Sequence, residues 1–165
     1  MINDIYGFRQ PGALDAVADS RCGLCVMHMQ GEPRTMQQAP AYGDVVGDVA
    51  AFLDEHAQRL LAAGVARERI CLDPGFGFGK TTAHNYQLMR SLPTIGALGY
   101  PLLIGVSRKT MIGAVTGRPV GERVAGSVAA ALAAVERGAA IVRVHDVAAT
   151  VDALKVWQAV RAWNE

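Results

Sequence analysis

An arginine and a histidine near the end of the chain have the types and spacing of an anion site. Arg143 and His145 are two residues apart and close the apolar run Ala140–Val144. If this run is a strand, both side chains point to the same side. An arginine can bind a phosphate through two nitrogens, and a histidine adds one more donor. The pair therefore predicts a site for an anionic group.

A carboxylate at the end of another apolar run has the chemistry to bind a heterocycle. Asp73 closes Ile70–Asp73 and is followed by Pro74. A carboxylate is costly to bury unless it is paired or hydrogen-bonded. Two neighbouring N–H groups of a heterocycle would satisfy it bidentately. A salt bridge to a neighbouring basic side chain is the alternative.

The segment after Asp73, DPGFGFGKTT, is rich in glycine but matches neither common nucleotide motif. A phosphate loop requires glycine where this chain has Pro74. The glycines are evenly spaced, which also excludes the dinucleotide pattern. They allow a sharp turn off the strand, so Phe76 and Phe78 either cover a flat ligand or pack on the core.

The elements that must position these residues alternate along the chain. Five apolar runs are strand candidates: Ile2–Ile5, Leu24–Met29, Ile70–Asp73, Leu102–Val106 and Ala140–Val144. Their continuous hydrophobicity is typical of strands buried on both faces. Helical segments lie between them, so we expect five strand–helix units and a parallel sheet. An open doubly wound sheet and a (β/α) barrel both fit this order.

Several local signals mark helices and their ends. Apolar stripes with helical spacing predict three helices. The stripes are Val49, Phe52, Leu53, Leu60 and Leu61; Val124, Val128, Ala131, Leu132 and Val135; and Val147, Val151, Leu154, Trp157 and Val160. Gly64 and Gly138 are expected where helices stop, Pro11 where the first helix begins, and Pro101 just before a strand.

Polar residues gather where each of the five runs ends. Because parallel strands place their carboxyl ends on one face, we expect these clusters to surround a single pocket. The alternative is that they cap the following helices, as Asp146 would. The clusters are Asn3–Asp4, Met27–His28, Asp73, Ser107–Lys109 and Arg143–Asp146.

Composition narrows the remaining possibilities. The 165 residues suggest one domain, 1–165, and the net charge of +1 gives no reason to expect nucleic acid or a membrane surface as partner. The N-terminus does not resemble a signal peptide, and three cysteines suit a reducing cytoplasm. Cys22 and Cys25 form a C-x-x-C pair, for which we favour buried thiols over a redox or metal role. The four histidines lack metal-ligand spacing, so we expect no metal site in this chain.

The ordered motifs of this chain resemble dihydropteroate synthase. The resemblance rests on NDI near the start, MHMQG at 27–31, DPGFGFGK at 73–80, GVSRK at 105–109 and RVHD at 143–146. It covers essentially the whole chain. The family fold is a TIM-type (β/α)8 barrel, which would settle the architecture. Because the chain begins at what would be the fourth strand, the resemblance implies an incomplete barrel of five units, with the first three missing.

The resemblance implies an enzyme of folate biosynthesis. Such a transferase condenses 6-hydroxymethyl-7,8-dihydropterin diphosphate with p-aminobenzoate and releases pyrophosphate. It also implies a cytoplasmic protein, a sulfonamide target and a possible homodimer through late helices, which here carry Trp157 and Trp163.

The same resemblance assigns roles to individual residues. Asn3, Met27, Asp73, Phe78 and Lys109 would bind the pterin. Arg143 and His145 would bind the diphosphate, and Ser107, Arg108 and Lys109 the p-aminobenzoate. The catalytic set would be Lys109, Arg143 and His145, with stabilisation of the departing negative charge as the main task.

Part of the family's machinery has no counterpart here. The family uses Mg²⁺, but the asparagine associated with it precedes this chain's first strand in the family order. Five strands would also leave two unpaired edges and an apolar interior open to water. We therefore expect the isolated chain to bind pterin weakly and to turn over poorly. The alternatives are a non-catalytic pterin-binding fragment or paralogue, and a pterin-dependent methyltransferase-like domain.

Overall fold

One parallel sheet organises the chain. In a computed structural model that describes residues 1–162, this sheet has five strands in the order β1-β2-β3-β4-β5. They are Ile2–Asp4 (β1), Leu24–Met27 (β2), Ile70–Asp73 (β3), Leu102–Ile104 (β4) and Ala139–Val142 (β5). Each strand pairs with its predecessor in the chain, whereas a doubly wound sheet reverses its strand order at a switch point. The fold is therefore an incomplete (β/α) barrel, as predicted.

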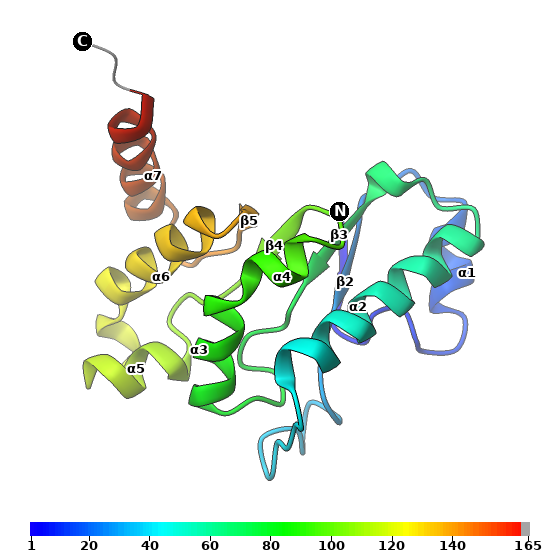
Figure 1. Cartoon of the computed structure of the whole chain (residues 1–165), viewed down its shortest axis with the longest axis horizontal. Helices are drawn as coiled ribbons and strands as arrows, with labels where there is room; N and C mark the ends of the chain where they lie inside the picture. The colour runs from blue at the N-terminus through cyan, green and yellow to red at the C-terminus, as the bar shows by residue number, and fades with distance from the viewer. Residues whose placement is uncertain (163–165) are drawn as a thin grey trace.

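Helices cover one face of this sheet. They are α1 (Ala13–Ala18), α2 (Val45–Ala62), α3 (Thr82–Arg90), α4 (Leu92–Gly96), α5 (Thr110–Thr116), α6 (Val124–Glu136) and α7 (Val147–Ala162). Two short 3₁₀ helices, Arg67–Arg69 and Val120–Glu122, precede β3 and α6. Figure 1 shows α2 to α6 arranged along the sheet, while α7 extends away from it.

The two faces of the central strands belong to different apolar clusters. Leu24, Val26, Ile70, Leu72, Leu102 and Ile104 join the large core beneath the helices. The alternate residues Cys25, Cys71 and Leu103 form a second cluster on the opposite face. Strand alternation therefore assigns this second, interior face also to Met27 and Asp73, which lie two residues beyond Cys25 and Cys71. The interior face carries the predicted site.

The outer strands differ from the prediction that every strand is buried on both faces. β2, β3 and β4 are buried throughout, but β1 and β5 are partly exposed because each has a neighbour on one side only. The expected opening of the interior to water is confined to these edges. Cys25 is 0% exposed and Cys71 5% exposed, whereas Ile141 is 37% exposed.

Most predicted helix boundaries are confirmed. Gly64 follows the end of α2 and Gly138 follows that of α6, both with positive φ, and Pro101 directly precedes β4. Pro11 does not begin α1, which starts at Ala13 after a Gly12 cap. At the start of α3, the Thr81 side chain accepts from the His84 amide, and the His84 ring bonds back to the Thr81 amide.

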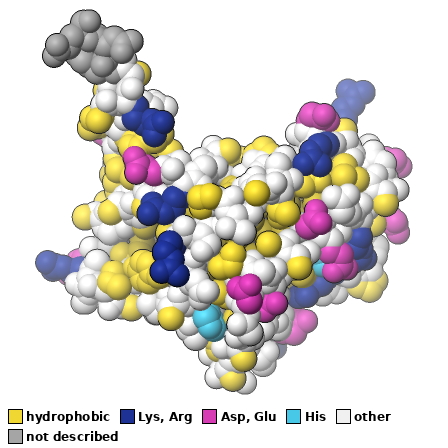
Figure 2. Space-filling model, viewed as in Figure 1, with side chains coloured by type: hydrophobic (Ala, Val, Ile, Leu, Met, Phe, Trp, Pro, Cys, Tyr) yellow, Lys and Arg dark blue, Asp and Glu magenta, His cyan; other side chains and the backbone are white. Residues whose placement is uncertain are grey.

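The last helix does not bury its apolar stripe. In α7, Val147, Val151 and Val160 are exposed, Leu154 and Trp157 are half-buried, and Thr150 is the buried residue. Hydrophobic side chains are visible along this helix at the upper left of Figure 2. Trp163 lies outside the described residues. The stripe is therefore only partly covered within residues 1–162.

The three cysteines are free thiols with different surroundings. Cys22 is exposed and precedes β2, so the expectation that it is buried is wrong. Cys25 lies beside Cys71 on the neighbouring strand, and a hydrogen bond with that thiol raises the pKa of Cys25. Among residues 1–162, no helix is both long enough and apolar enough to span a bilayer.

Candidate functional site

Asp73 is a buried carboxylate at the carboxyl end of β3. It is 5% exposed and lies in register with Met27 of β2. Its Oδ1 accepts a hydrogen bond of 2.8 Å from the Gly75 amide. Burial raises the pKa of Asp73, while the Gly75 amide and the nearby Lys109, Lys80 and Arg143 act in the opposite direction. No described residue donates a hydrogen bond to Oδ2, so this oxygen is available to a ligand.

Lys109 joins the loop after β4 to the glycine-rich loop after β3. Its Nζ donates to the Phe76 carbonyl at 2.5 Å and lies 4.9 Å from the centre of the Phe78 ring. Burial lowers the pKa of Lys109 to about 8, although Asp73 raises it. The structure thus brings Asp73, Met27, Phe78 and Lys109 together, and their binding of a pterin stays a prediction.

Asn3 lies farther from this group. It pairs with Cys25, and strand alternation places it on the interior face, one level below Met27 and Asp73. Asn3 is exposed because β1 is an edge strand. Its predicted contact with a pterin stays a prediction.

Ser107 and Arg108 contact the motif after β5. Ser107 is buried, and its Oγ accepts from the His145 amide at 3.1 Å and bonds to His145 Nδ1 at 3.0 Å. Arg108 binds Asp146 through two nitrogens, at 3.0 and 2.5 Å. Asp146 therefore pairs with an arginine through its side chain. The p-aminobenzoate contacts predicted for Ser107 and Arg108 are untested.

Arg143 and His145 do not lie on a strand together, contrary to the prediction, because β5 ends at Val142. The Arg143 amide still donates to the Ile104 carbonyl at 2.9 Å, so the backbone stays beside β4 for one more residue. Arg143 lies next to Gly105. A methyl group added to Gly105 would be 3.8 Å from the Arg143 Cβ. Both side chains are exposed, and Ser107 fixes the His145 ring.

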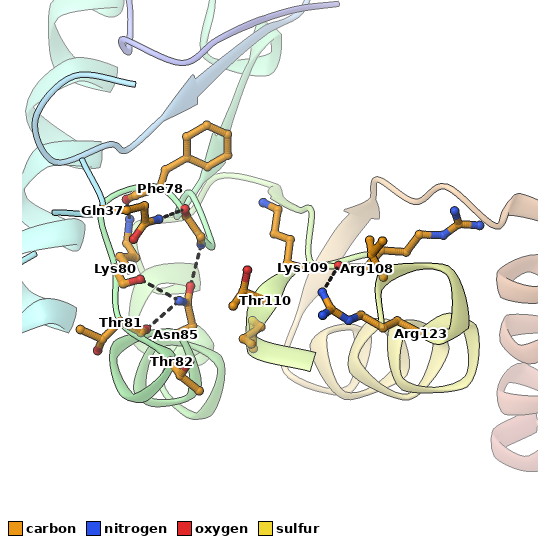
Figure 3. Close-up of a pocket in the computed structure, with 13 residues that line it drawn as sticks. Gln37, Phe78, Lys80, Thr81, Thr82, Asn85, Arg108, Lys109, Thr110 and Arg123 are labelled. Carbon is orange, nitrogen blue, oxygen red and sulfur yellow. Dashed lines mark hydrogen bonds between the residues drawn. The ribbon is translucent and has the colours of Figure 1, made fainter. Parts of the chain in front are cut away.

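A pocket of about 650 Å³ lies between the glycine-rich loop and the start of α5. Figure 3 shows Lys109 extending toward the loop that carries Phe78, with Arg108 and Arg123 on the far side. Of the predicted site residues, only Phe78, Arg108 and Lys109 line it. The five clusters therefore share one end of the sheet, but they do not surround one pocket, because an open sheet does not enclose its interior face.

One contributor to this end of the sheet, Lys80, was missed by sequence reasoning, whereas its partner His28 was expected there. Lys80 is 3% exposed and bonds to the ring of His28 at 2.9 Å. Burial lowers the pKa of Lys80 to about 7 and, together with the Lys80 charge, that of His28 to about 3. The lysine stands in the glycine-rich motif, but nothing in the sequence indicates that its ammonium group is buried.

A magnesium ion finds no ligand set in the part of the chain that the structure describes. No group of three or more His, Cys, Asp or Glu side chains within residues 1–162 is arranged to hold a metal ion. The magnesium that the resemblance implies therefore stays a prediction.

Comparisons with known proteins identify the family of this chain. A family model described as "Pterin binding enzyme" matches residues 1–145. Dihydropteroate synthase of Haemophilus influenzae is 54% identical over 159 residues, which cover 96% of this chain and 58% of that protein.

Two solved structures have the same fold over the length of this chain. Dihydropteroate synthase from Stenotrophomonas maltophilia, with imidazole bound in its active site, superposes with a TM-score of 0.97 at 57% identity, covering 100% of this chain and 63% of that one. The Burkholderia cenocepacia enzyme complexed with 7,8-dihydropteroate gives a TM-score of 0.90 at 64% identity, covering 98% and 60%. The chain thus spans less than two thirds of the proteins it matches.

Proposed function

Because the chain belongs to the pterin binding enzyme family, we propose that it builds the pterin- and diphosphate-binding part of a dihydropteroate synthase. The proposed reaction joins 6-hydroxymethyl-7,8-dihydropterin diphosphate to p-aminobenzoate. The bond between the pterin methylene and the diphosphate oxygen breaks, and pyrophosphate leaves with the electron pair. The amine nitrogen then bonds to the methylene carbon and releases a proton.

Asp73 carries this proposal. A buried carboxylate with one free oxygen, beside Met27 and the aromatic Phe78, suits a flat heterocycle that offers two N–H groups. Lys109 opposes the rise that burial causes in the pKa of Asp73, and its Nζ lies 4.9 Å from the centre of the Phe78 ring. Asn3 would complete the pterin contacts from β1.

The anionic end of the substrate fits the loop after β5. Arg143 is a cation beside Gly105. Ser107 binds His145 at Nδ1, which leaves Nε2 on the other side of the ring for the ligand. Both groups would stabilise the charge on the departing diphosphate. The pocket beside Phe78 and Lys109, which Arg108 also lines, would take p-aminobenzoate.

Other parts of the proposal concern the surroundings of the protein. Magnesium would take its ligands from outside residues 1–162, since these offer no ligand set. Free thiols suit a reducing cytoplasm. The exposed valines of α7 would bury their surface in a homodimer, which sedimentation equilibrium can measure.

Pterin binding by the Asp73→Asn variant tests the proposal. We expect its affinity for the pterin diphosphate to fall at least about tenfold, because asparagine presents an N–H group where the ligand needs an acceptor. Calorimetry measures the change, and Asp152→Asn on the exposed part of α7 is the matched control. Equal affinities of the Asp73→Asn variant and the parent chain would exclude Asp73 as the pterin ligand.

A further inference from the structure

Lys80 makes three hydrogen bonds through one buried nitrogen. Its Nζ donates to the carbonyls of Gly75 at 2.9 Å and Phe78 at 3.0 Å, and bonds to His28 Nδ1 at 2.9 Å. Two of these partners belong to the glycine-rich loop, and His28 directly follows β2. A single ammonium group therefore ties the loop to the neighbouring strand.

The loop lies directly against the segment that follows β2. A methyl group on Gly75 would come 1.8 Å from the His28 carbonyl oxygen, and one on Gly79 would come 2.6 Å from that of Gln30. Such contact leaves no room for water, so the loop carbonyls that face inward need a protein donor. Lys80 supplies a donor to the Phe78 carbonyl and a second one to the Gly75 carbonyl, which also accepts from the Phe78 amide at 3.1 Å.

A second anchor holds the outer side of the same loop. Asn85 of α3 accepts from the Gly77 amide at 2.7 Å and donates to the Thr81 carbonyl, as the dashed lines in Figure 3 show. Lys109 reaches the Phe76 carbonyl from the loop after β4. Phe78 is therefore carried by a short loop that is fixed from three sides, and Lys80 provides the inner contact.

We propose that Lys80 is a positioning residue for the ligand site. It holds the glycine-rich loop against the end of β2 and thereby places the Phe78 ring beside Lys109 and Asp73. The hydrogen bonds of the Lys80 nitrogen go to His28 and to the loop. The step from loop position to ligand binding rests on the pterin-binding function proposed above.

The protonation chemistry of the contact agrees with this role. Burial lowers the pKa of Lys80 to about 7, with Asp73 raising it and Lys109 lowering it further. A neutral amine can still donate to both carbonyls and accept from His28, because the imidazole can carry its proton on Nδ1. All three contacts thus survive loss of the lysine proton.

Replacement of Lys80 by methionine tests the proposal, since it keeps the apolar stem and removes the donor. In Lys80→Met we expect amide hydrogen exchange at residues 75–79 to rise at least about tenfold, with α2 and β3 unchanged. The affinity for 6-hydroxymethyl-7,8-dihydropterin should fall by a similar factor. Lys155→Met, at an exposed position of α7, should change neither.

The possible outcomes distinguish the positioning role of Lys80 from the proposed pterin-binding function. Unchanged exchange at residues 75–79 would overturn the anchoring role, and faster exchange with unchanged pterin affinity would overturn the positioning role. If the parent chain binds no pterin while Lys80→Met still loosens the loop, the proposed function fails and the anchor stands.

A measurement on the parent chain covers the case in which Lys80→Met does not fold. Competitive acetylation of the folded protein compares the lysines directly. After each rate is divided by the neutral fraction of its amine, we expect Lys80 to react more than about tenfold more slowly than Lys155, because its nitrogen is buried and fully bonded. Equal rates would show that the ammonium group is not held.

Discussion

The residues that matter most are ionisable groups placed out of water. His28, Asp73 and Lys80 are each at most 6% exposed, and they occupy the ends of β2 and β3 together with the loop that follows. Each has a pKa displaced in the direction that disfavours its charge, because burial is the largest cause. Such displaced groups at one end of a parallel sheet are typical of a functional site.

His28 predicts how stability depends on acid. Its pKa falls from 6.5 to about 3 on folding, so between these values the unfolded chain binds a proton that the folded chain does not. The contribution of His28 to the free energy of unfolding is fully present above pH 6.5 and is lost as the pH falls toward 3. The slope approaches about 1.4 kcal/mol per pH unit.

Urea unfolding from pH 7 to 4 checks this expectation. In His28→Gln the free energy of unfolding should depend less steeply on pH than in the parent chain. Identical slopes in the two proteins would show that His28 titrates alike in the folded and unfolded states.

At the level of elements, the short loops do more than the strands to shape the site. The strand β3 delivers Asp73, but the turn after it determines where Phe78 lies. Gly75 has φ of +68° and faces the backbone of His28, so both its conformation and its close contact require glycine. The loops after β4 and β5 are joined in turn by the pairs Ser107–His145 and Arg108–Asp146.

Glycine-to-alanine variants separate these two requirements. Gly64 has a positive φ, and a Cβ added there would meet no atom within 4 Å. For Gly64→Ala we therefore expect the free energy of unfolding to fall by about 1 kcal/mol from backbone strain alone. Gly75→Ala adds a collision with the His28 carbonyl and should cost about 3 kcal/mol.

Gly43→Ala, with open space and no positive φ, is the control and should be nearly neutral. Urea denaturation gives all three values. An equal cost at Gly64 and Gly75 would contradict the close contact between the loop and β2.

At the scale of the whole molecule, the pattern of the sequence predicts the strands, the family resemblance predicts their order, and neither predicts the long-range side-chain contacts. Continuous apolar runs such as Ile70–Asp73 predict the strands, and the residues that follow them predict which end carries chemistry. Local pattern cannot show that Lys80 turns inward to His28, because that contact spans 52 residues of sequence. Nor does it show that β5 ends before Arg143, since an edge strand loses its pairing early.

The sheet is also open among the described residues. β1 and β5 each pair with one strand only, and Ile2 at the edge is 40% exposed. A closed barrel of this type has eight strands. Weak pterin binding and weak turnover by the isolated chain therefore both stay predictions.

Binding of the pterin with and without its diphosphate tests the central claim most directly. Calorimetry on the 165-residue chain compares 6-hydroxymethyl-7,8-dihydropterin diphosphate with the unphosphorylated pterin. We predict that the diphosphate form binds at least about tenfold more tightly, and that Arg143→Ala removes this difference while leaving the affinity for the unphosphorylated pterin intact. Equal affinities for the two ligands, or no binding of either, would contradict a pterin diphosphate site in this chain.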